Sequence, residues 1–507
     1  MDREQTKRYI KHLESGKKSW LWLWDMVYRF VLPERAYLYV QDGSPPPHER
    51  VYDSTAINSA ERLTNLIISG LCPPWQMWFR LKPGHQITRE SDRAAVRAQT
   101  EVLEKHIFNL FNQSNFYQEF QPFILDRIVG GTGALGYKET DKGLEFQCVP
   151  LSEVCFADDD KGDIIAFSRK YKMPLFLLER KYPKVKNSDY YNTAKENPQE
   201  KETLIVFSIR TKTDDWEECV YLEKDFYELH KETRAYPSII GSRWSKVPGA
   251  PYGRGPAIRS LSDIRAANRL KELVMKNAGR TALGIYTVVD DGIINPYTLT
   301  LREGSFIPVG TNDTAAPSIA ALPPAGDFDV SMISLDRLQS EIKNSFIADQ
   351  FGPVDKTPMS ATEVAERTRV VAQELGMTIG RLEYEVLIPL LEIALDFIKK
   401  NNPDIPNELK FDGEVVQIEF TSRLAQSQWA MEDQELSQYM AELAQYAQLD
   451  PKLAMLMNPV EAFRYKAELK GIPAKLFRDD RTIEQMVQQA QEAARAEQQA
   501  TGGQDVG

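Results

Sequence analysis

The sequence predicts an α+β fold in which a helical N-terminal part leads into a β-rich middle and then into further helices. Between Ala56 and Ile67, apolar residues recur at the three- and four-residue spacing that gathers them on one face of a helix. Residues 136–244 instead hold short runs of β-branched and aromatic residues, separated by segments with turn chemistry. A chain of 507 residues exceeds one compact core, so we expect several substructures.

The N-terminal part is expected to be a set of helices. Asp53 is placed to cap the helix that carries the apolar stripe, and Cys72-Pro73-Pro74 ends it. Further helices are predicted over Glu90–Phe111 and Phe116–Val129. Charged residues interrupt the apolar stretch Trp20–Leu32, so we interpret it as an amphipathic helix with an aromatic face.

The middle of the chain is expected to be mostly antiparallel β-structure. Turn chemistry at Asp158-Asp159-Asp160-Lys161-Gly162 and at Lys212–Asp215 separates the strands, and Tyr182–Lys201 forms a polar insertion. The predicted strands are Leu144–Val149, Ile164–Lys170, Leu204–Ile209 and Glu218–Leu222.

The second half is expected to be mainly helical. One long helix begins in the capping box Ser360–Glu363 and runs towards Lys400, with a bend near Gly376, Gly380 or Pro389. The other expected elements are a loop at Pro248–Pro256, helices at Ala257–Thr281 and Val330–Asp349, strands at Leu283–Val289, Ser305–Val309 and Val415–Phe420, and C-terminal helices that fray into a tail after Glu484.

Composition argues against several classes of protein. The net charge of −11 argues against a protein that binds nucleic acid over its whole surface, although DNA could still pass by without being bound. No apolar run is long enough to span a membrane and the first residues are mostly charged, so we expect a soluble protein without a signal peptide. Scattered cysteines predict neither a disulfide framework nor a zinc site, as expected in a reducing cytoplasm; they are Cys72, Cys148, Cys155 and Cys219.

A glycine-rich segment has the spacing of a nucleotide-binding loop. Gly131–Gly136 matches G-x-G-x-x-G, but that fingerprint needs a strand before it and a helix after it, and the predicted order is the reverse. In the related Walker A pattern, Tyr137 stands where the Lys belongs and Lys138 where the Ser or Thr belongs. We interpret the segment as a helix stop and turn.

Other catalytic signals are weak. The five histidines never fall at metal-ligand spacing, and no G-x-S-x-G elbow is present. Asp158–Asp160 could attract a divalent cation, but a solvated hairpin turn is the favoured interpretation. We therefore expect a protein that is not an enzyme and holds no cofactor.

Segments in a fixed order resemble the podovirus head-to-tail connector (portal) family. The resemblance covers about Val51 to Leu391. It is carried by Val51–Ala56, Ala60–Leu63, Trp75–Leu81, Asp126–Gly133, Arg243-Trp244, Tyr252–Ala257, Leu261–Ile264, Ser360–Arg367, Leu382–Glu385 and Leu387–Leu390.

The resemblance implies a subunit with a helical and β-rich wing, a two-helix stem, a small β-containing clip and an α-helical crown, assembled in a ring of twelve copies. Residues 1–256 would form the wing, 257–281 and 330–350 the stem helices, 282–329 the clip, 351–359 a channel loop, 360–424 a long helix and wing return, and 425–507 the crown.

The first stem helix carries a basic stripe. Arg265, Arg269, Lys276 and Arg280 share one face at offsets of four, seven and four residues. The stripe could steady the DNA backbone, pair with acids on a neighbouring subunit, or be a solvated face. The resemblance adds further candidates for the DNA channel: Arg337, Lys343, Lys356 and Thr357.

The resemblance also implies the setting in which the protein works. The ring would sit at the portal vertex of the virion capsid after synthesis in the host cytoplasm. It would pass double-stranded DNA during packaging and ejection, and contact the terminase large subunit, the major capsid and scaffolding proteins and tail adaptor proteins, with no membrane partner. Two alternatives are another virion structural protein, such as a baseplate or capsid component, and a metal-dependent nuclease using Asp158–Asp160.

Overall fold

The structure is a computed structural model of the chain, divided into two units, Met1–Phe420 and Thr421–Gly507, each described by itself. It describes residues 2–35, 51–84, 90–188, 191, 199–283, 286–288, 319–321, 328–347, 374–401, 416–421, 423–447 and 458–469.

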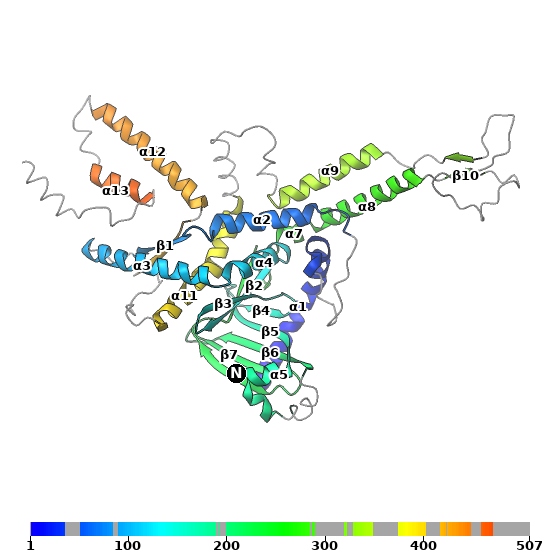
Figure 1. Cartoon of the computed structure of the whole chain (residues 1–507), viewed down its shortest axis with the longest axis horizontal. Coiled ribbons are helices and arrows are strands. Elements are labelled where there is room, and N and C mark those ends of the chain that lie inside the picture. The colour runs from blue at the N-terminus through cyan, green and yellow to red at the C-terminus, as the bar shows by residue number, and fades with distance from the viewer. Residues whose placement is uncertain are drawn as a thin grey trace, which may run out of the picture. The chain divides into compact units, whose positions relative to one another are not determined.

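Helices make up most of the described N-terminal part of the first unit (Figure 1). They are α1 (Arg3–Val31), α2 (Thr55–Leu71), α3 (Glu90–Gln113) and α4 (Phe116–Val129), with the short η1 (Pro33–Arg35) after α1. The predictions for the last three are confirmed. The first helix is much longer than the predicted Trp20–Leu32, because Asp2 forms a capping box with Gln5 and starts it near the N-terminus.

The first turns of α1 are stabilised by packing on a β-sheet. Ile10 and Leu13 are buried with Phe207 and Cys219 of the β-rich region, and the Tyr9 ring meets the Phe207 ring edge-on at 5.8 Å. These anchors are spaced by three and four residues, so one face of α1 lies against a sheet. The helix is thus held by tertiary contacts where its sequence is mostly polar.

Two antiparallel sheets make up the β-rich region. The strand order is β3-β2-β9 in one and β4-β5-β6-β7-β8 in the other. Their bounds are β2 (Thr132–Thr140), β3 (Gly143–Cys148), β4 (Val154–Asp158), β5 (Ile164–Pro174), β6 (Lys201–Arg210), β7 (Trp216–Leu222), β8 (Glu228–Arg234) and β9 (Ile239–Arg243), with α5 (Leu175–Lys181) and η2 (Pro183–Asn187) between β5 and β6.

The four predicted strands of this region are confirmed as β3, β5, β6 and β7. β4, β8, β9 and α5 were not predicted. β8 is an edge strand made mostly of polar and charged residues, and in β9 the two isoleucines are followed at once by Gly241 and Ser242, so neither strand gives the longer run of β-branched and aromatic residues that signals a strand. The expected turns are present: Gly162 N–H donates to Asp159 O at 3.0 Å, and Thr211 N–H to Asp215 O at 2.7 Å.

A further strand pair joins distant parts of the first unit. β1 (Phe79–Pro83) pairs antiparallel with β12 (Val416–Phe420), and the Trp78 ring stacks on Phe420 at 6.4 Å. The prediction of a strand at Val415–Phe420 is confirmed. The pairing gives the Trp75–Leu81 segment a structural role, because it joins the N-terminal helices to residues 416–420.

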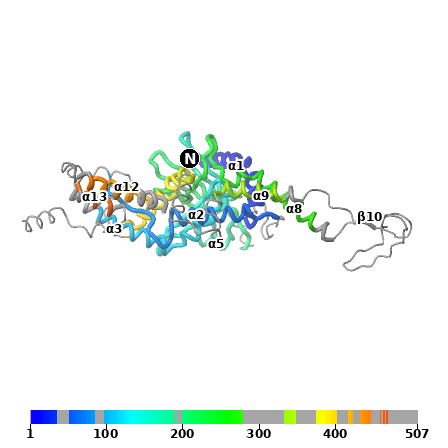
Figure 2. Tube along the Cα trace, turned by 90° about the horizontal axis from the view of Figure 1, so that it is seen from above, coloured from blue at the N-terminus to red at the C-terminus, as the bar shows by residue number. Residues whose placement is uncertain are grey.

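Two helices of the second half lie side by side (Figures 1 and 2). α8 (Leu261–Leu283) leads towards β10 (Tyr286–Val288), which pairs antiparallel with β11 (Ile319–Ala321), and α9 (Phe328–Ser345) returns. The single helix predicted over Ala257–Thr281 is wrong in one respect: α7 (Pro256–Arg259) is separate, because Ser260 leaves helical geometry with ψ near 12°. The strand expected at Ser305–Val309 lies outside the described residues.

The long helix of residues 374–401 changes geometry just before Pro389, one of the three places where a bend was predicted, and the change there is a π-helical turn. It is α-helical over 374–382, becomes the π-helix η3 (Glu383–Leu387), and continues as α11 (Ile388–Asn401). Gly376 and Gly380, the other two candidates for the bend, lie within the regular stretch 374–382. The predicted start of this helix, Ser360–Glu363, lies outside the described residues.

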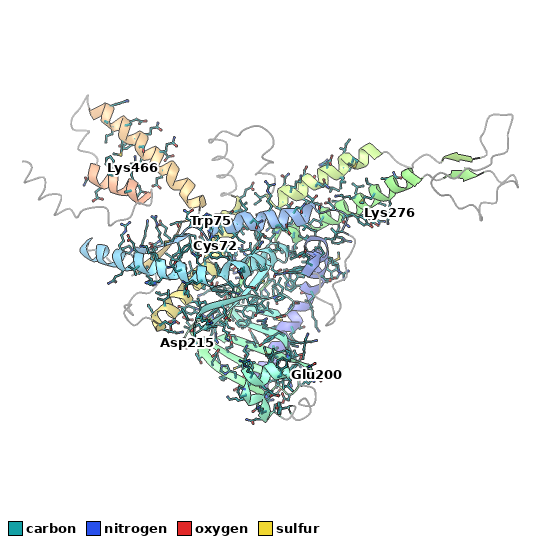
Figure 3. All side chains as sticks on the ribbon, viewed as in Figure 1. Cys72, Trp75, Glu200, Asp215, Lys276 and Lys466 are labelled. Atoms are coloured by element: carbon teal, nitrogen blue, oxygen red, sulfur yellow. The ribbon has the colours of Figure 1, made fainter. Side chains whose placement is uncertain are left out.

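The second unit contains the helices α12 (Arg423–Ala447) and α13 (Pro459–Leu469), which pack on each other. Lys466 of α13 donates a 2.6 Å hydrogen bond to Ser437 of α12 and lies 3.6 Å from Asp433 (Figure 3). A helical C-terminal region is confirmed for these residues; the expected tail after Glu484 lies outside the described ranges.

Aromatic side chains dominate the core of the first unit. Phe111, Phe116, Phe120 and Phe123 are fully buried, and the Phe116 ring lies 4.9 Å from Phe111 and 4.8 Å from Phe120. Such pairs add about 0.5–1.5 kcal/mol beyond simple burial. This cluster fixes α3 and α4 on the β2–β3 hairpin. All four cysteines are free thiols, and no described helix is long and apolar enough to cross a membrane.

Candidate functional site

The basic stripe lies on the exposed side of α8. Arg265, Arg269 and Lys276 are exposed, with 63% of the Arg269 side chain and 54% of the Lys276 side chain accessible (Figure 3). Arg280 belongs to the same helix, but its side chain is outside the described set. The structure thus places three of the four predicted side chains on an open surface.

An acid within the stripe neutralises part of its charge. Glu272 accepts a 2.7 Å hydrogen bond from Arg269 and a second from Lys276, at i,i+3 and i,i+4 spacing. These bonds lower the pKa of Glu272 and keep it ionised. Exposed pairs of this kind exchange readily with other partners, so Arg269 and Lys276 remain able to meet an external anion.

The remaining channel candidates are spread over a second helix and an undescribed segment. Arg337 of α9 is 81% exposed and bonds Glu341 at 3.1 Å, one turn along the same helix. Lys343 is half-buried on α9. Lys356 and Thr357 lie outside the described residues.

A buried aspartate fixes α8 and α9 to the start of α2. Asp53 Oδ1 accepts hydrogen bonds from Lys271 Nζ of α8 at 3.1 Å and from Gln339 Nε2 of α9 at 2.8 Å. Only 4% of the Asp53 side chain is accessible, against 32% for Lys271. The carboxylate therefore sets the position of both helices that carry the channel candidates.

The predicted capping role of Asp53 is wrong. Ser54 occupies the N-cap position of α2, and its side chain makes no capping bond. The Asp53 carboxylate instead serves Lys271 and Gln339, because the backbone carries it towards α8: Asn268 Oδ1 accepts from Tyr52 N–H at 2.7 Å and from Asp53 N–H at 3.1 Å. The segment Val51–Ala56 stood out in the sequence, but no neighbouring residue indicated that the Asp53 carboxylate would bond side chains of α8 and α9.

Two glycine segments cross where the chain enters α7 and α8. Gly131 has φ +77°, and a Cβ there would lie 2.3 Å from Gly253 O. A Cβ on Gly255 would lie 2.1 Å from Ile128 O. Gly253 N–H donates to Thr132 Oγ1 at 2.9 Å. Only glycine permits backbones to approach so closely, so these motifs fix the place where α7 and α8 begin.

The G-x-G-x-x-G segment is thereby explained without a nucleotide. The segment follows α4 and leads into a strand, as predicted, but the turn is confined to its first residue: Gly131 has φ +77°, whereas Thr132–Gly136 already belong to β2. The prediction of a turn over the whole segment is therefore wrong. Trp244 N–H donates to Gly131 O at 2.9 Å, and Trp24 Nε1 donates to the carbonyl of the preceding Gly130 at 2.9 Å, so both carbonyls at the turn are hydrogen-bonded within the protein.

The acidic turn has a structural role as well. Asp159 Oδ1 accepts from Asp163 N–H at 2.8 Å, and these bonds within the β4–β5 turn lower the pKa of Asp159. Asp158 Oδ2 lies 3.9 Å from Arg243 Nη1. Within the described ranges, no three or more His, Cys, Asp and Glu side chains gather as a metal site would require.

Comparison with known proteins places the chain in a family. The model of the family described as "Bacteriophage head to tail connecting protein" matches residues 3–477 of this chain. The chain is 24% identical to the probable portal protein of Bordetella phage BPP-1, over 98% of this chain and 93% of that protein. It is 21% identical to the portal protein of Salmonella phage epsilon15, over 99% and 94%, and 23% identical to that of Escherichia phage T7, over 72% and 70%.

These relatives favour a portal over the alternatives of a baseplate or capsid component and of a nuclease, since each of them is named as a portal protein. The ordered motifs, the mixed helix and sheet architecture and the match over nearly the whole length agree. The chain belongs to the family of bacteriophage head to tail connecting proteins, and its function is that of a phage portal.

Proposed function

We propose that copies of this chain close into a ring, with twelve the expected number, around a channel for double-stranded DNA in a short-tailed phage. In this ring residues 257–281 and 330–350 are the stem helices, and α8 and α9 supply most of them. Residues 282–329 form the clip, in which β10 and β11 pair. Residues 1–256 form the wing, with 360–424 returning to it, 351–359 form the channel loop, and 425–507 the crown.

Exposed apolar side chains on the two stem helices carry the proposal. Leu273 and Met275 of α8 are 47% and 54% exposed, and Met332 and Ile333 of α9 are 37% and 69% exposed. Apolar groups gathered on a projecting helix pair favour contact with another protein surface. A second copy, joined head to tail, would cover them, and repetition of such a heterologous contact closes a ring.

The basic stripe suits a conduit. Phosphate contacts are independent of sequence and weaken with salt, so they centre DNA without fixing its register. Arg265, Arg269, Lys276 and Arg280 would face the DNA, together with Arg337, Lys343, Lys356 and Thr357. The internal pairing of Glu272 with two of these cations moderates the attraction. This favours passage of DNA over tight binding.

The ring would occupy one vertex of the virion capsid. There it would contact the major capsid and scaffolding proteins, dock the terminase large subunit during packaging, and receive tail adaptor proteins before ejection. The energy for packaging would come from the terminase motor, with the ring as its passive conduit.

Assembly state tests the proposal. Native mass spectrometry with negative-stain imaging of the full chain is expected to find a closed ring of about a dozen copies with a central hole. Leu273→Asp with Ile333→Asp should prevent ring closure, because each buries a charge in the contact. Phe176→Asp, at a 52% exposed position on α5 in the wing, is the matched control and should leave the ring intact. A stable small oligomer without a hole, even with scaffold and capsid proteins added, would refute the ring.

A further inference from the structure

The π-helix interrupts a helix that would otherwise be regular. Ile388 N–H donates to Glu383 O, five residues back. Pro389 follows at once; it has no N–H for the carbonyl of Glu385, and its ring would clash with that carbonyl in a regular helix. The extra residue of a π-turn rotates residues 374–382 by about 100° relative to a regular continuation of α11.

A buried ion pair fastens the middle of this π-helix to the wing. Glu385 accepts three hydrogen bonds from Arg243, the last residue of β9: from N–H at 2.7 Å, Nε at 3.1 Å and Nη2 at 2.7 Å. Both side chains are nearly inaccessible, at 8% and 3%. Arg243 Nη2 also donates to Gly162 O at 2.8 Å, which holds the guanidinium against the β4–β5 turn.

A second buried arginine grips the helix just before the π-turn. Arg127 of α4 donates from Nη2 to Thr378 O at 2.8 Å and to Arg243 O at 3.0 Å. Its guanidinium lies 5.4 Å from the Trp244 ring centre. Burial lowers the pKa of Arg127 to about 9, although Glu385 opposes that shift. The two arginines therefore hold the helix just before its irregular turn and in the middle of that turn.

Some hydrogen-bond donors of Arg127 and Arg243 have no acceptor at this contact. Arg127 Nε and Nη1 and Arg243 Nη1 are buried without a hydrogen-bond partner in the described part of the chain. Unsatisfied buried donors are rare and tend to occur where a structure stores strain or serves a function.

We propose that Glu385, held by Arg243 and assisted by Arg127, is a latch that keeps the π-turn in place and so sets the rotation of residues 374–382 on the wing. In the latched setting, Leu375 and Leu382 face the core and Met377 is 88% exposed. Released, the helix shifts its π-turn and turns a neighbouring set of residues inward.

The glycines of this helix make such a rotation sterically feasible. Gly376 follows Leu375 and would replace it on the inner face without bringing a side chain that could clash there. The latch thus decides which side chains the helix presents outward. All of its contacts lie within one chain, so the inference goes beyond the proposed ring and does not depend on it.

Hydrogen exchange of the full-length chain, followed by mass spectrometry, tests the latch. Glu385→Gln should raise amide exchange about tenfold in peptides covering 374–388, with β5–β7 unchanged. Arg243→Lys should do the same more weakly, because it keeps one charge but lacks the forked geometry. Glu153→Gln, which breaks the 2.9 Å pair with Arg169 elsewhere on the wing, is the matched control.

A double variant separates a latch from an ordinary stabilising contact. Pro389→Ala removes the cause of the π-turn, so Glu385→Gln with Pro389→Ala should exchange more slowly at 383–388 than Glu385→Gln alone, as a regular helix forms. The inference is overturned if Glu385→Gln with Pro389→Ala exchanges no more slowly at 383–388 than Glu385→Gln alone, if exchange at 374–388 is unchanged in Glu385→Gln, or if exchange rises over the whole chain.

Discussion

At the scale of single residues, three glycines and one aspartate have roles that the hydrophobic pattern of the sequence does not reveal. Gly131, Gly253 and Gly255 are required because backbones touch, and Asp53 because two helices share its carboxylate. Each of these residues lies in a motif that suggested the family. Their roles are structural: they place α8 and α9, on which the channel candidates lie.

Where the two glycine segments cross, adding a single methyl group is expected to destabilise the fold strongly. Gly255→Ala should lower the free energy of unfolding by about 3 kcal/mol, because its Cβ would lie 2.1 Å from Ile128 O and the backbone must move. Gly376→Ala is the control: its Cβ meets nothing, and it should raise stability by about 0.5–1 kcal/mol by favouring the helix. Urea unfolding of both variants measures the contrast, and equal effects would contradict this account.

Asp53→Ala tests the shared carboxylate. It should lower the free energy of unfolding by about 1–3 kcal/mol, since Lys271 and Gln339 lose a common buried acceptor. Thr55→Ala, which removes only the 3.1 Å local bond to Asp53, should cost far less. Similar losses in both variants would show that the link to α8 and α9 is unimportant.

At the scale of elements, the long helix of residues 374–401 shows how one proline reshapes a turn. The π-helix at Glu383–Leu387 precedes Pro389 and brings Glu385 to Arg243. Glu383 begins the same turn, half-buried, and burial raises its pKa to about 7. The element is therefore sensitive to pH as well as to the ion pair.

Glu383 gives a pH-dependent prediction with a definite sign. Because its pKa is raised in the folded chain, its contribution to stability is full below its unfolded pKa of about 4.5 and is lost as pH rises through about 7. Glu383→Gln should therefore raise the free energy of unfolding at pH 8, by about 1 kcal/mol after allowance for partial solvation, and leave it unchanged near pH 4. Thermal unfolding at both pH values measures this; a gain of equal size at both would contradict it.

At the scale of the whole molecule, the proposed ring joins charge and assembly. An acidic chain with a net charge of −11 can still present cations to DNA if one face of each copy points inward. The basic stripe then acts through many copies at once. The same stripe could instead pair with acids of a neighbouring copy, and the two roles predict different measurements.

Salt dependence of DNA binding distinguishes these roles. If the stripe faces DNA, assembled rings of Arg269→Ala with Lys276→Ala should form normally, bind DNA more weakly, and show a shallower slope of log affinity against log salt, by about 0.9 for each phosphate that is no longer neutralised. If it pairs with a neighbour, the double variant should fail to close rings. Arg210→Ala, on the wing beside Asp214, is the control and should change neither.

The sequence by itself determined the α+β class, the helices α2, α3 and α4, four strands of the β-rich region and the absence of a nucleotide-loop context at Gly131. These depend on periodicity and turn chemistry within a few residues of each other. Only the tertiary structure decided that Asp53 serves α8 and α9, that β9 is a strand and that Glu385 meets Arg243, 142 residues away. The physical reason is that local patterns record short-range preferences, whereas a buried charge, or a short strand interrupted by Gly and Ser, is stabilised only by partners that the fold brings to it.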